Sequence, residues 1–380
     1  MLVDFVVRSD ALVKPGGDSV QVDAYLDELT ARGVDAQVHP YRSRMALRPG
    51  SIVHVVNIDR PFDFLDTSAQ AHGRPLVAST IHHDLHRVRA MRRAERGWSL
   101  RALAGRVLPE SGRELAAYVA RTARDQDWSV AVRAGVRAVP HLVGVWAAVG
   151  HELDAAVAVA LLARGEGESL RRDTGWSGRN GILTPNGVPP VPRGSGADWA
   201  ARTVPVLVVG RVEPRKRQLE IARAAAAADV PVVFAGAPST SSPGYAEEFR
   251  RVVDGAPGLR YDGALAHPDV LALMASSRVL LNASFVEVQS LVDIEAAMLG
   301  AYVVCIDNGH SGEWLGPALV DAGRSVASAV ALAGRTAERP SGPAPTAYPV
   351  TWSTTVDVLV AAYVRAQAGA VPGAEPGTDR

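Results

Sequence analysis

The chain has 380 residues, a length that favours two domains over one. Apolar residues make up 47% and charged residues 21%, as in globular proteins with a substantial core. The 40 basic and 40 acidic side chains cancel, so long-range attraction to nucleic acid has no support. We expect a cytoplasmic protein, because no apolar run reaches the length of a membrane span and Asp4 interrupts any signal-peptide core.

The rare residue types add two observations. Cys305 is the single cysteine, which excludes an internal disulfide and indicates a buried thiol in a reducing compartment. Lys14 and Lys216 are the only lysines in a chain that otherwise uses arginine. A lysine retained against this bias suits phosphate binding as a compact point charge, and chance is the competing explanation.

The first half alternates strand and helix patterns. Residues 3–7 predict a strand, and a glycine-bearing loop, an amphipathic helix ending at Gly33 and a strand over 34–40 follow. Further strands are expected at 51–58, 74–80 and 181–188, whereas the region from about Asp84 to Gly165 has a helical, arginine-rich pattern. The stretch 189–202 is rich in Pro, Gly and Ser and predicts a linker.

The second half repeats the alternation more regularly. Strands are expected at 204–210, 230–236, 259–263, 278–283, 301–307 and 318–322, and helices begin near Lys216, Gly244, Pro268, Leu291 and Ser325. The predicted domains are an N-terminal domain (1–190) with an arginine-rich helical insert, a C-terminal domain (203–350), a closing helix (351–368) and a disordered tail (369–380). The predicted fold class is α/β, with two doubly wound Rossmann-like domains facing a central cleft.

Basic residues follow the first strand of the second half. Gly210 and Arg211 end that strand, and Lys216 lies at the mouth of the next helix. Two cations beside the amides of a helix N-terminus suit a diphosphate. The competing interpretation, solvated charges flanking a turn, is slightly favoured by this motif alone.

Two acids flank a helix start in the stretch SFVEVQSLVDIEAAMLG. Ser290 and Asp293 fit a capping box, which makes Leu291 about the first helical residue. The cap does not explain Glu287, in the loop, or Glu295, in the second helical turn. Such acids suit sugar hydroxyls, while the amides at the cap face a phosphate. The alternative, that both acids serve the helix dipole, fits Glu287 better than Glu295.

The order of GR-x4-K, E-x7-E and A-x3-G resembles the nucleotide-sugar half of retaining GT-B glycosyltransferases, specifically glycosyltransferase family four. The family consensus runs roughly EGFGLxxxEA, and the chain has EVQSLVDIEA. The resemblance covers the whole second half and includes the closing helix, where Trp352 matches the family's aromatic residue. The first half is similar more loosely, through KPGGDSVQVDAYLDELTARG, STIHHD and PNGV.

The resemblance implies a bacterial, metal-independent glycosyltransferase of hexosyltransferase type that needs no cofactor. It would move a sugar, with retention of configuration, from a nucleoside-diphosphate sugar to an acceptor hydroxyl. Arg211 and Lys216, beside Gly210, would hold the diphosphate as leaving group. Glu287 would bind the transferred sugar, and Glu295 the ribose hydroxyls.

Other contacts are implied in the same way. The amides of Ser290 and Leu291 would meet the distal phosphate, although this turn departs from the family because Val288 and Ser290 replace glycines. In the first domain, His82 aligns with the histidine that faces the donor sugar, and His83 is its competitor. The glycines Gly16 and Gly17 would admit donor or acceptor, with Lys14 nearby.

Three other functions remain open at this point. A nucleotide-sugar epimerase shares the architecture, but the two motifs together favour the transferase. A non-catalytic partner subunit with a degenerate sugar-nucleotide pocket is the second possibility. The replaced glycines favour it, and the intact glutamates and cations argue against it. Nucleic-acid binding is the weakest, given the balanced charge.

The acceptor and the oligomeric state are left open by the sequence. A polysaccharide, a glycolipid or a secondary metabolite would each suit the reaction, and no motif demands an oligomer. The arginine-rich segment 86–108 has interleaved apolar residues and predicts either peripheral contact with an anionic membrane, an anionic acceptor site or a solvated face. The solvated face ranks first, because arginine is the default base of this chain.

Overall fold

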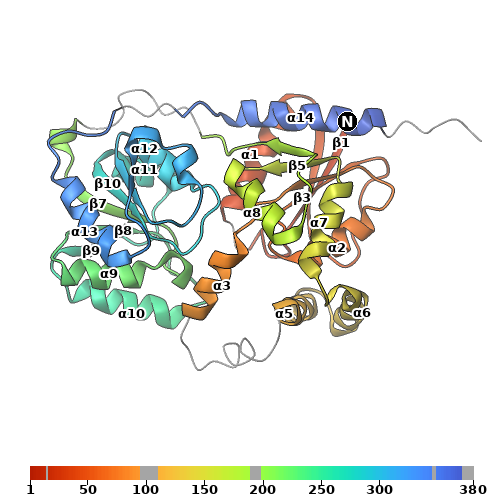
Figure 1. Ribbon diagram of the computed structural model, residues 1–380, viewed down its shortest axis with the longest axis horizontal. Helices are drawn as coiled ribbons and strands as arrows, with labels where there is room; N and C mark the ends of the chain where they lie inside the picture. Colours follow the sequence, from red (N-terminus) through yellow and green to blue (C-terminus); the bar gives the residue numbers. More distant parts are fainter. Residues whose placement is uncertain (14–15, 95–109, 189–197, 345–347, 370–380) are drawn as a thin grey trace, which may run out of the picture. The chain divides into compact units, whose positions relative to one another are not determined.

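The computed structural model describes residues 1–13, 16–94, 110–188, 198–344 and 348–369, and these form two compact units (Figure 1). Unit 1 comprises residues 1–82, 97–187 and 352–380, and unit 2 comprises residues 83–96 and 188–351. The C-terminal helix therefore belongs with the first half of the chain. A short segment of the first half, residues 83–94, groups with unit 2.

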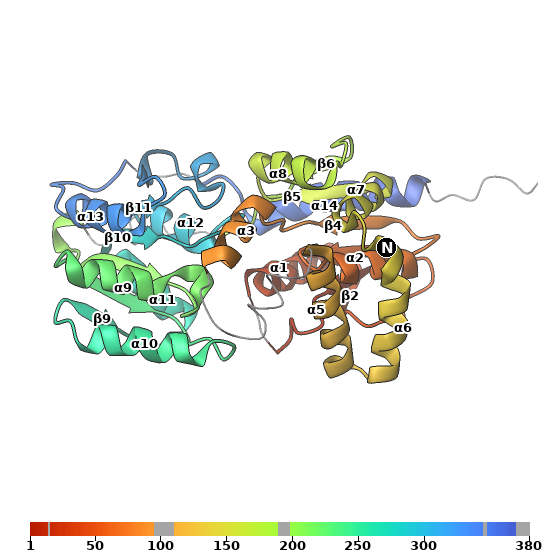
Figure 2. The same ribbon diagram turned by 60° about the horizontal axis from the view of Figure 1, so that its bottom comes forward.

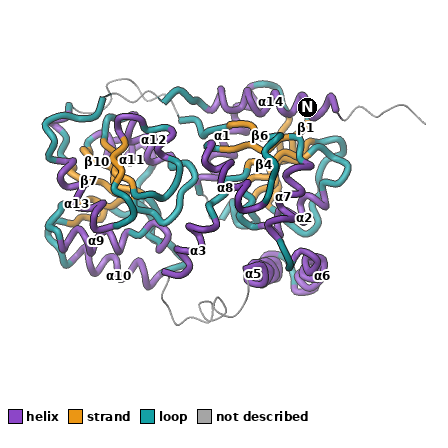
Figure 3. The backbone as a smooth tube through the Cα atoms, in the orientation of Figure 1, coloured by secondary structure: helices purple, strands orange, loops and turns teal. Residues whose placement is uncertain are grey.

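Unit 1 contains a parallel sheet of six strands in the order β2-β1-β3-β4-β5-β6. In chain order these are β1 (Leu2–Val7), β2 (Asp35–Pro40), β3 (Ile52–Val56), β4 (Leu76–Ser79), β5 (Ala158–Leu161) and β6 (Gly181–Leu183). All five residues of β3 are buried, as expected for a central strand covered on both faces. Figure 3 shows the strands of each unit enclosed by helices.

The helices of unit 1 cover the two faces of this sheet. Helices α1 (Gly17–Ala31) and α14 (Trp352–Gly369) share one apolar core. The opposite core includes α2 (Pro61–Gln70), α5 (Glu110–Asp125), α6 (Trp128–Ala138) and α7 (Val145–Ala155), and α8 (Arg164–Thr174) follows β5. None of the helices in the described parts of the chain is both long and apolar enough to cross a bilayer.

Strand β5 was not expected, because its region was assigned to helices. The strand lies between β4 and β6, and all four of its residues are buried. A short strand buried on both faces loses the alternation that identifies strands, and its alanines are strong helix formers. Pattern alone therefore extends α7 through this segment, whereas pairing with two neighbouring strands makes it part of the sheet.

Unit 2 has a second parallel sheet, in the order β12-β11-β10-β7-β8-β9. Its strands are β7 (Val204–Val209), β8 (Val232–Ala235), β9 (Leu259–Tyr261), β10 (Ser277–Asn282), β11 (Tyr302–Cys305) and β12 (Leu319–Asp321). Its helices are α3 (Leu85–Ala94), α9 (Gln218–Ala227), α10 (Pro243–Asp254), α11 (His267–Ala275), α12 (Leu291–Met298) and α13 (Val326–Ala337). The strands predicted for the second half are all present.

The closing helix is joined to unit 1 by polar and aromatic contacts. The hydroxyl of Tyr363 on α14 lies 2.5 Å from Nδ1 of His54 on β3. Arg32, at the end of α1, donates to Asp357 at 2.7 Å. Trp352, the aromatic residue singled out in the sequence, packs edge-on against Tyr25 with ring centroids 6.0 Å apart. The tail beyond residue 369 lies outside the described residues.

Candidate functional site

The predicted donor residues are in unit 2, at the carboxyl ends of β7 and β10. The turn after β7 begins at Gly210, whose φ of +142° is a conformation that side-chain-bearing residues rarely adopt. The buried side chain of Gln218 holds this turn, because its amide donates to the carbonyls of Gly210 and Arg211 at 3.1 and 2.6 Å. A short 3-10 helix (Pro214–Lys216) follows, and α9 starts only after Arg217, which has a φ of +58°.

Lys216 and Glu287 form the central ion pair of this region. The Lys216 Nζ lies 2.5 Å from Oε1 of Glu287, and a guanidinium nitrogen of Arg215 lies 3.6 Å from Oε2. Burial alone raises the pKa of Glu287, but the positive charges of Lys216 and Arg215 outweigh it and lower that pKa to about 2. The structure therefore brings together two of the predicted site residues and holds Glu287 as a carboxylate.

Arg211 is the more open cation of the turn. Its side chain is 45% exposed and lies 3.6 Å from Glu213, which also pairs with Arg215 at 3.2 Å. Ion pairs link five charged groups of the two loops, three cations and two carboxylates (Arg211, Arg215, Lys216, Glu213 and Glu287). The excess of one positive charge, with Arg211 facing solvent, suits an anionic ligand.

The start of α12 matches the predicted capping box in part. Ser290 is the N-cap residue and its hydroxyl accepts from the amide of Asp293, so Leu291 is the first helical residue as expected. The carboxylate of Asp293, however, is buried and accepts from Asn282 on β10 at 2.9 Å and from Ser311 at 2.9 Å. Asp293 thus ties the helix start to the sheet.

Glu295 lies in α12, and its side chain is 10% exposed. It contacts a histidine that the sequence motif did not predict. The Nε2 of His267, the first residue of α11, lies 2.9 Å from Oε1 of Glu295. Burial raises the pKa of Glu295, and the contact with His267 opposes this shift. A carboxylate that already has one imidazole partner retains lone pairs for ligand hydroxyls.

The residues that depart from the family pattern point into unit 2. Val288 is 4% exposed and belongs to the buried residues, and Gln289 is 8% exposed. The amide nitrogen of Gln289 lies 2.8 Å from the hydroxyl of Tyr348. The side chain of Gln289 therefore links this loop to the segment before α14.

In unit 1, His82 follows β4 and is 1% exposed. Its amide donates to Oε1 of Glu166 at 2.7 Å, and its Nε2 lies 3.0 Å from Oδ2 of Asp173. Because a carboxylate only accepts, Asp173 favours a proton on Nε2. Nδ1 has no hydrogen-bond partner among the described residues, and the nearest carboxylate oxygen, of Asp59, lies at 3.8 Å.

Two further features of unit 1 lie at strand ends. Ile81, directly before His82, has a φ of +44°, which is strained for a β-branched residue and is a frequent mark of functional loops. Gly16 is the N-cap of α1 and Gly17 its first residue, and a Cβ at Gly17 would meet no atom within 4 Å. Gly17 is exposed, so the space beside it is open to solvent, and Lys14 lies outside the described residues.

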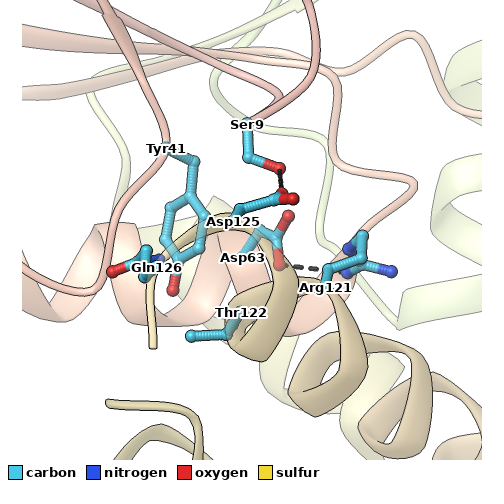
Figure 4. Close-up of a pocket in the computed structure, with 7 residues that line it drawn as sticks. All are labelled: Ser9, Tyr41, Asp63, Arg121, Thr122, Asp125 and Gln126. Carbon is cyan, nitrogen blue, oxygen red and sulfur yellow. Dashed lines mark hydrogen bonds and ion pairs between the residues drawn. The ribbon is translucent and has the colours of Figure 1, made fainter. Parts of the chain in front are cut away.

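A small polar pocket opens in unit 1 between α5 and the loop after β1 (Figure 4). Ser9 donates to Asp125 at 2.8 Å, and Arg121 donates to Asp63 at 3.1 Å. Burial raises the pKa of Asp63, although Arg121 and Arg60 oppose this shift. Hydrogen bonds among its own residues leave no room in it for a ligand, and the lining residues are Ser9, Tyr41, Asp63, Arg121, Thr122, Asp125 and Gln126.

Sequence reasoning missed four residues that hold the predicted ones in place. They are Gln218, His267, Glu166 and Asp173, and each acts across the fold, so no local motif marks it. His267 has one detectable signal, its position before a proline at a helix start. Within the described residues, no group of three or more His, Cys, Asp or Glu side chains could hold a metal ion.

Comparison with known proteins gives similarity in structure only. No protein-family model and no curated protein sequence matches the chain. Sucrose-phosphate synthase from Thermosynechococcus elongatus has 14% identity and a TM-score of 0.58 over 98% of this chain and 100% of that one. HepE from Anabaena, in complex with UDP, has 12% identity and a TM-score of 0.56 over 96% and 100%.

A third solved structure, AviGT4, is a glycosyltransferase involved in avilamycin A biosynthesis. It has 19% identity and a TM-score of 0.51 over 97% of this chain and 98% of that one. Together these similarities confirm the predicted GT-B fold with two Rossmann-like units. At such low identity, similarity in structure establishes the fold, and function has to be argued from the site.

Proposed function

We propose that the protein is a retaining, metal-independent glycosyltransferase that uses a nucleoside-diphosphate sugar. The observation that carries the proposal is the charged cluster at the carboxyl ends of β7 and β10, where Lys216 and Arg215 hold Glu287 ionised and Arg211 faces solvent. Ligands of doubly wound sheets bind at this edge. HepE, one of the proteins of similar fold, has been solved with UDP and with UDP-glucose.

In this proposal the donor lies across the two loops of unit 2. Arg211 and Lys216 bind the diphosphate, the amides at Ser290 and Leu291 meet its distal phosphate, and Glu295 accepts from the ribose hydroxyls. Glu287 accepts from a hydroxyl of the transferred sugar. The resemblance assigns to His82 of unit 1 a contact with that sugar, and Asp173 favours a proton on its Nε2.

The transfer breaks the bond between the anomeric carbon and the diphosphate oxygen and forms a bond to the acceptor oxygen on the same face. The acceptor proton passes to the departing phosphate. Negative charge grows on the diphosphate as the bond breaks, so fixed cations stabilise the transition state more than the ground state. The acceptor is a hydroxyl group of a polysaccharide, a glycolipid or a small molecule.

The proposal is tested by thermal unfolding with UDP, GDP, ADP and dTDP and their common sugars. A ligand that binds the folded state raises the melting temperature by mass action. We expect one nucleotide to stabilise the wild type but not Glu295→Gln, while Glu247→Gln, an exposed acid on α10, retains the shift. No stabilisation by any nucleotide would overturn the donor site. In a transfer assay, a product of inverted anomeric configuration would overturn retention.

A further inference from the structure

Glu295 differs from the other two acids around the start of α12 in how its carboxylate is held. Glu287 is paired with two cations, and the carboxylate of Asp293 is bound by an asparagine and a serine. Among the described residues, Glu295 has a single hydrogen-bond partner, the Nε2 of His267 at 2.9 Å. The carboxylate of Glu295 therefore keeps more of its lone pairs for a ligand than the other two do.

The contact between His267 and Glu295 is not what packs their two helices together. Helices α11 and α12 both belong to unit 2 (Figure 2), and Met274 of α11 shares a buried apolar core with Ile294 and Ala297 of α12. The side chain of His267 lies at the surface and is 57% exposed. Because exposed pairs contribute little to stability, the contact calls for another role than holding the helices.

The hydrogen bond with His267 sets the direction of the carboxylate. The terminal torsion of a glutamate side chain has broad, roughly two-fold preferences, so packing of the stem alone does not set it. An ionised carboxylate only accepts, so the Nε2 of His267 donates to Oε1 and fixes the plane of the group. The remaining lone pairs can then accept from two neighbouring hydroxyl groups. A ribose offers such a pair, whereas a 2′-deoxyribose offers one hydroxyl.

We propose that His267 is a positioning residue for Glu295 and makes the donor site prefer ribonucleoside diphosphates to their 2′-deoxy counterparts. The inference rests on the proposed function, because it takes the ribose hydroxyls as ligands of Glu295. His267 lies outside the GR-x4-K and E-x7-E motifs and acts through Glu295. A nucleotide without the 2′-hydroxyl leaves the oriented carboxylate one hydrogen bond short, and a hydrogen bond to a charged group changes the affinity about tenfold.

The test is calorimetric titration of the full-length protein with UDP, GDP and ADP and with the 2′-deoxy form of each. We expect the wild type to bind one of the three, and to bind it about tenfold more tightly than its 2′-deoxy form. His267→Gln should retain this ratio, because the amide nitrogen of glutamine reaches as far as Nε2. His267→Asn has a shorter amide that cannot reach Glu295, so its ratio should fall below about threefold.

The ratio of the two affinities separates positioning from a structural role, because general loosening of the site weakens both nucleotides alike. Both variants change an exposed side chain, and thermal unfolding should show that they are folded. A wild type without a preference for ribose, or an unchanged ratio in His267→Asn, would overturn the inference and leave the donor site standing. Equal losses in His267→Gln and His267→Asn would also overturn it, since the imidazole would then act on the nucleotide itself. If none of the three nucleotides binds, the proposed function is wrong and the inference with it.

Discussion

The imidazole of His267 lies against the carboxylate of Glu295, with Nε2 2.9 Å from Oε1. Glu295 belongs to α12 and His267 starts α11, so the contact joins two consecutive βα units at the carboxyl edge of the sheet of unit 2. Burial raises the pKa of Glu295, which means that this buried acid costs stability when it is ionised. A residue kept at such a cost is a candidate for ligand binding.

Glu295→Gln should therefore stabilise the folded protein at neutral pH while it removes the nucleotide-dependent shift. The raised pKa contributes stability that is present below the unfolded value near 4.5 and is lost as pH rises through the folded pKa. At pH 7 we expect the melting temperature of the variant to be higher than that of the wild type. Below pH 4 the gain should vanish. Thermal unfolding from pH 4 to 8 checks this, and a variant less stable than wild type at pH 7 would contradict it.

The pKa of Glu287 is shifted in the opposite direction. Its pKa is lowered to about 2, so its ion pairs contribute stability that is present above pH 4.5 and is lost as pH falls towards 2. Glu287→Gln should lower the free energy of unfolding at pH 7 by roughly 2–3 kcal/mol, because Lys216 and Arg215 lose their partner. Urea unfolding at pH 7 and pH 3 measures the effect, which should be smaller at pH 3. The control, Glu247→Gln, should change neither value.

In unit 1, Glu166 should be a positioning residue for the loop that carries His82. Its carboxylate is fully buried and accepts from the Thr80 hydroxyl at 2.6 Å, the His82 amide at 2.7 Å and the Leu162 amide at 2.6 Å. Glu166→Ala leaves these donors unsatisfied, so we expect a loss of about 2–3 kcal/mol in stability. Glu168→Ala, at an exposed position of the same helix, should cost less than about 0.5 kcal/mol.

A second measurement separates positioning from stability alone. Glu166→Gln retains a carbonyl oxygen that accepts from Thr80 and His82, so under the proposed function it should recover more of the transfer rate than Glu166→Ala at a temperature where both are folded. Equal rates for the two variants would reduce Glu166 to a structural role. If Glu166→Ala is as stable as the wild type in urea unfolding, the hydrogen-bond argument is wrong.

The regular parts of the fold follow from local pattern. The strands of unit 2 are short apolar runs separated by amphipathic helices, and the S-x-x-D stretch places the start of α12 at Leu291. Strand β5 was missed because its alanines favour helix and its two neighbours in the sheet are distant in sequence. Its assignment depends on tertiary pairing that a single-segment pattern does not contain.

The site was predictable to the extent that its residues belong to local motifs. Lys216 and Glu287 were singled out separately, and the fold pairs them across 71 positions of sequence. The partner His267 was not found because its contact with Glu295 is made by a neighbouring βα unit. The carboxylates around His82 were missed for the same reason, since both come from α8. Spacing identifies the residues of one loop, and only the packed sheet brings several loops to one edge.

Three glycines of unit 2 give a ranked prediction. Gly236 has a φ of +144°, and a Cβ there would lie 2.1 Å from the carbonyl oxygen of Gly210, which is backbone and cannot rotate away. Gly210 has a φ of +142°, but the nearest atom to its Cβ would be Cε of the flexible Lys216 side chain, at 3.6 Å. Gly244 on α10 has an ordinary conformation and open space.

Substitution by alanine should therefore lower the stability most at Gly236, by more than about 3 kcal/mol, because both strain and a backbone clash are added. Gly210→Ala should cost roughly 1–2 kcal/mol for the backbone conformation, and under the proposed function it should also weaken nucleotide binding. Gly244→Ala should be neutral within about 0.5 kcal/mol. Urea unfolding of the three variants gives the order. If Gly210→Ala costs as much as Gly236→Ala, the clash with the Gly210 carbonyl is not the dominant effect, and strain in the backbone controls both positions.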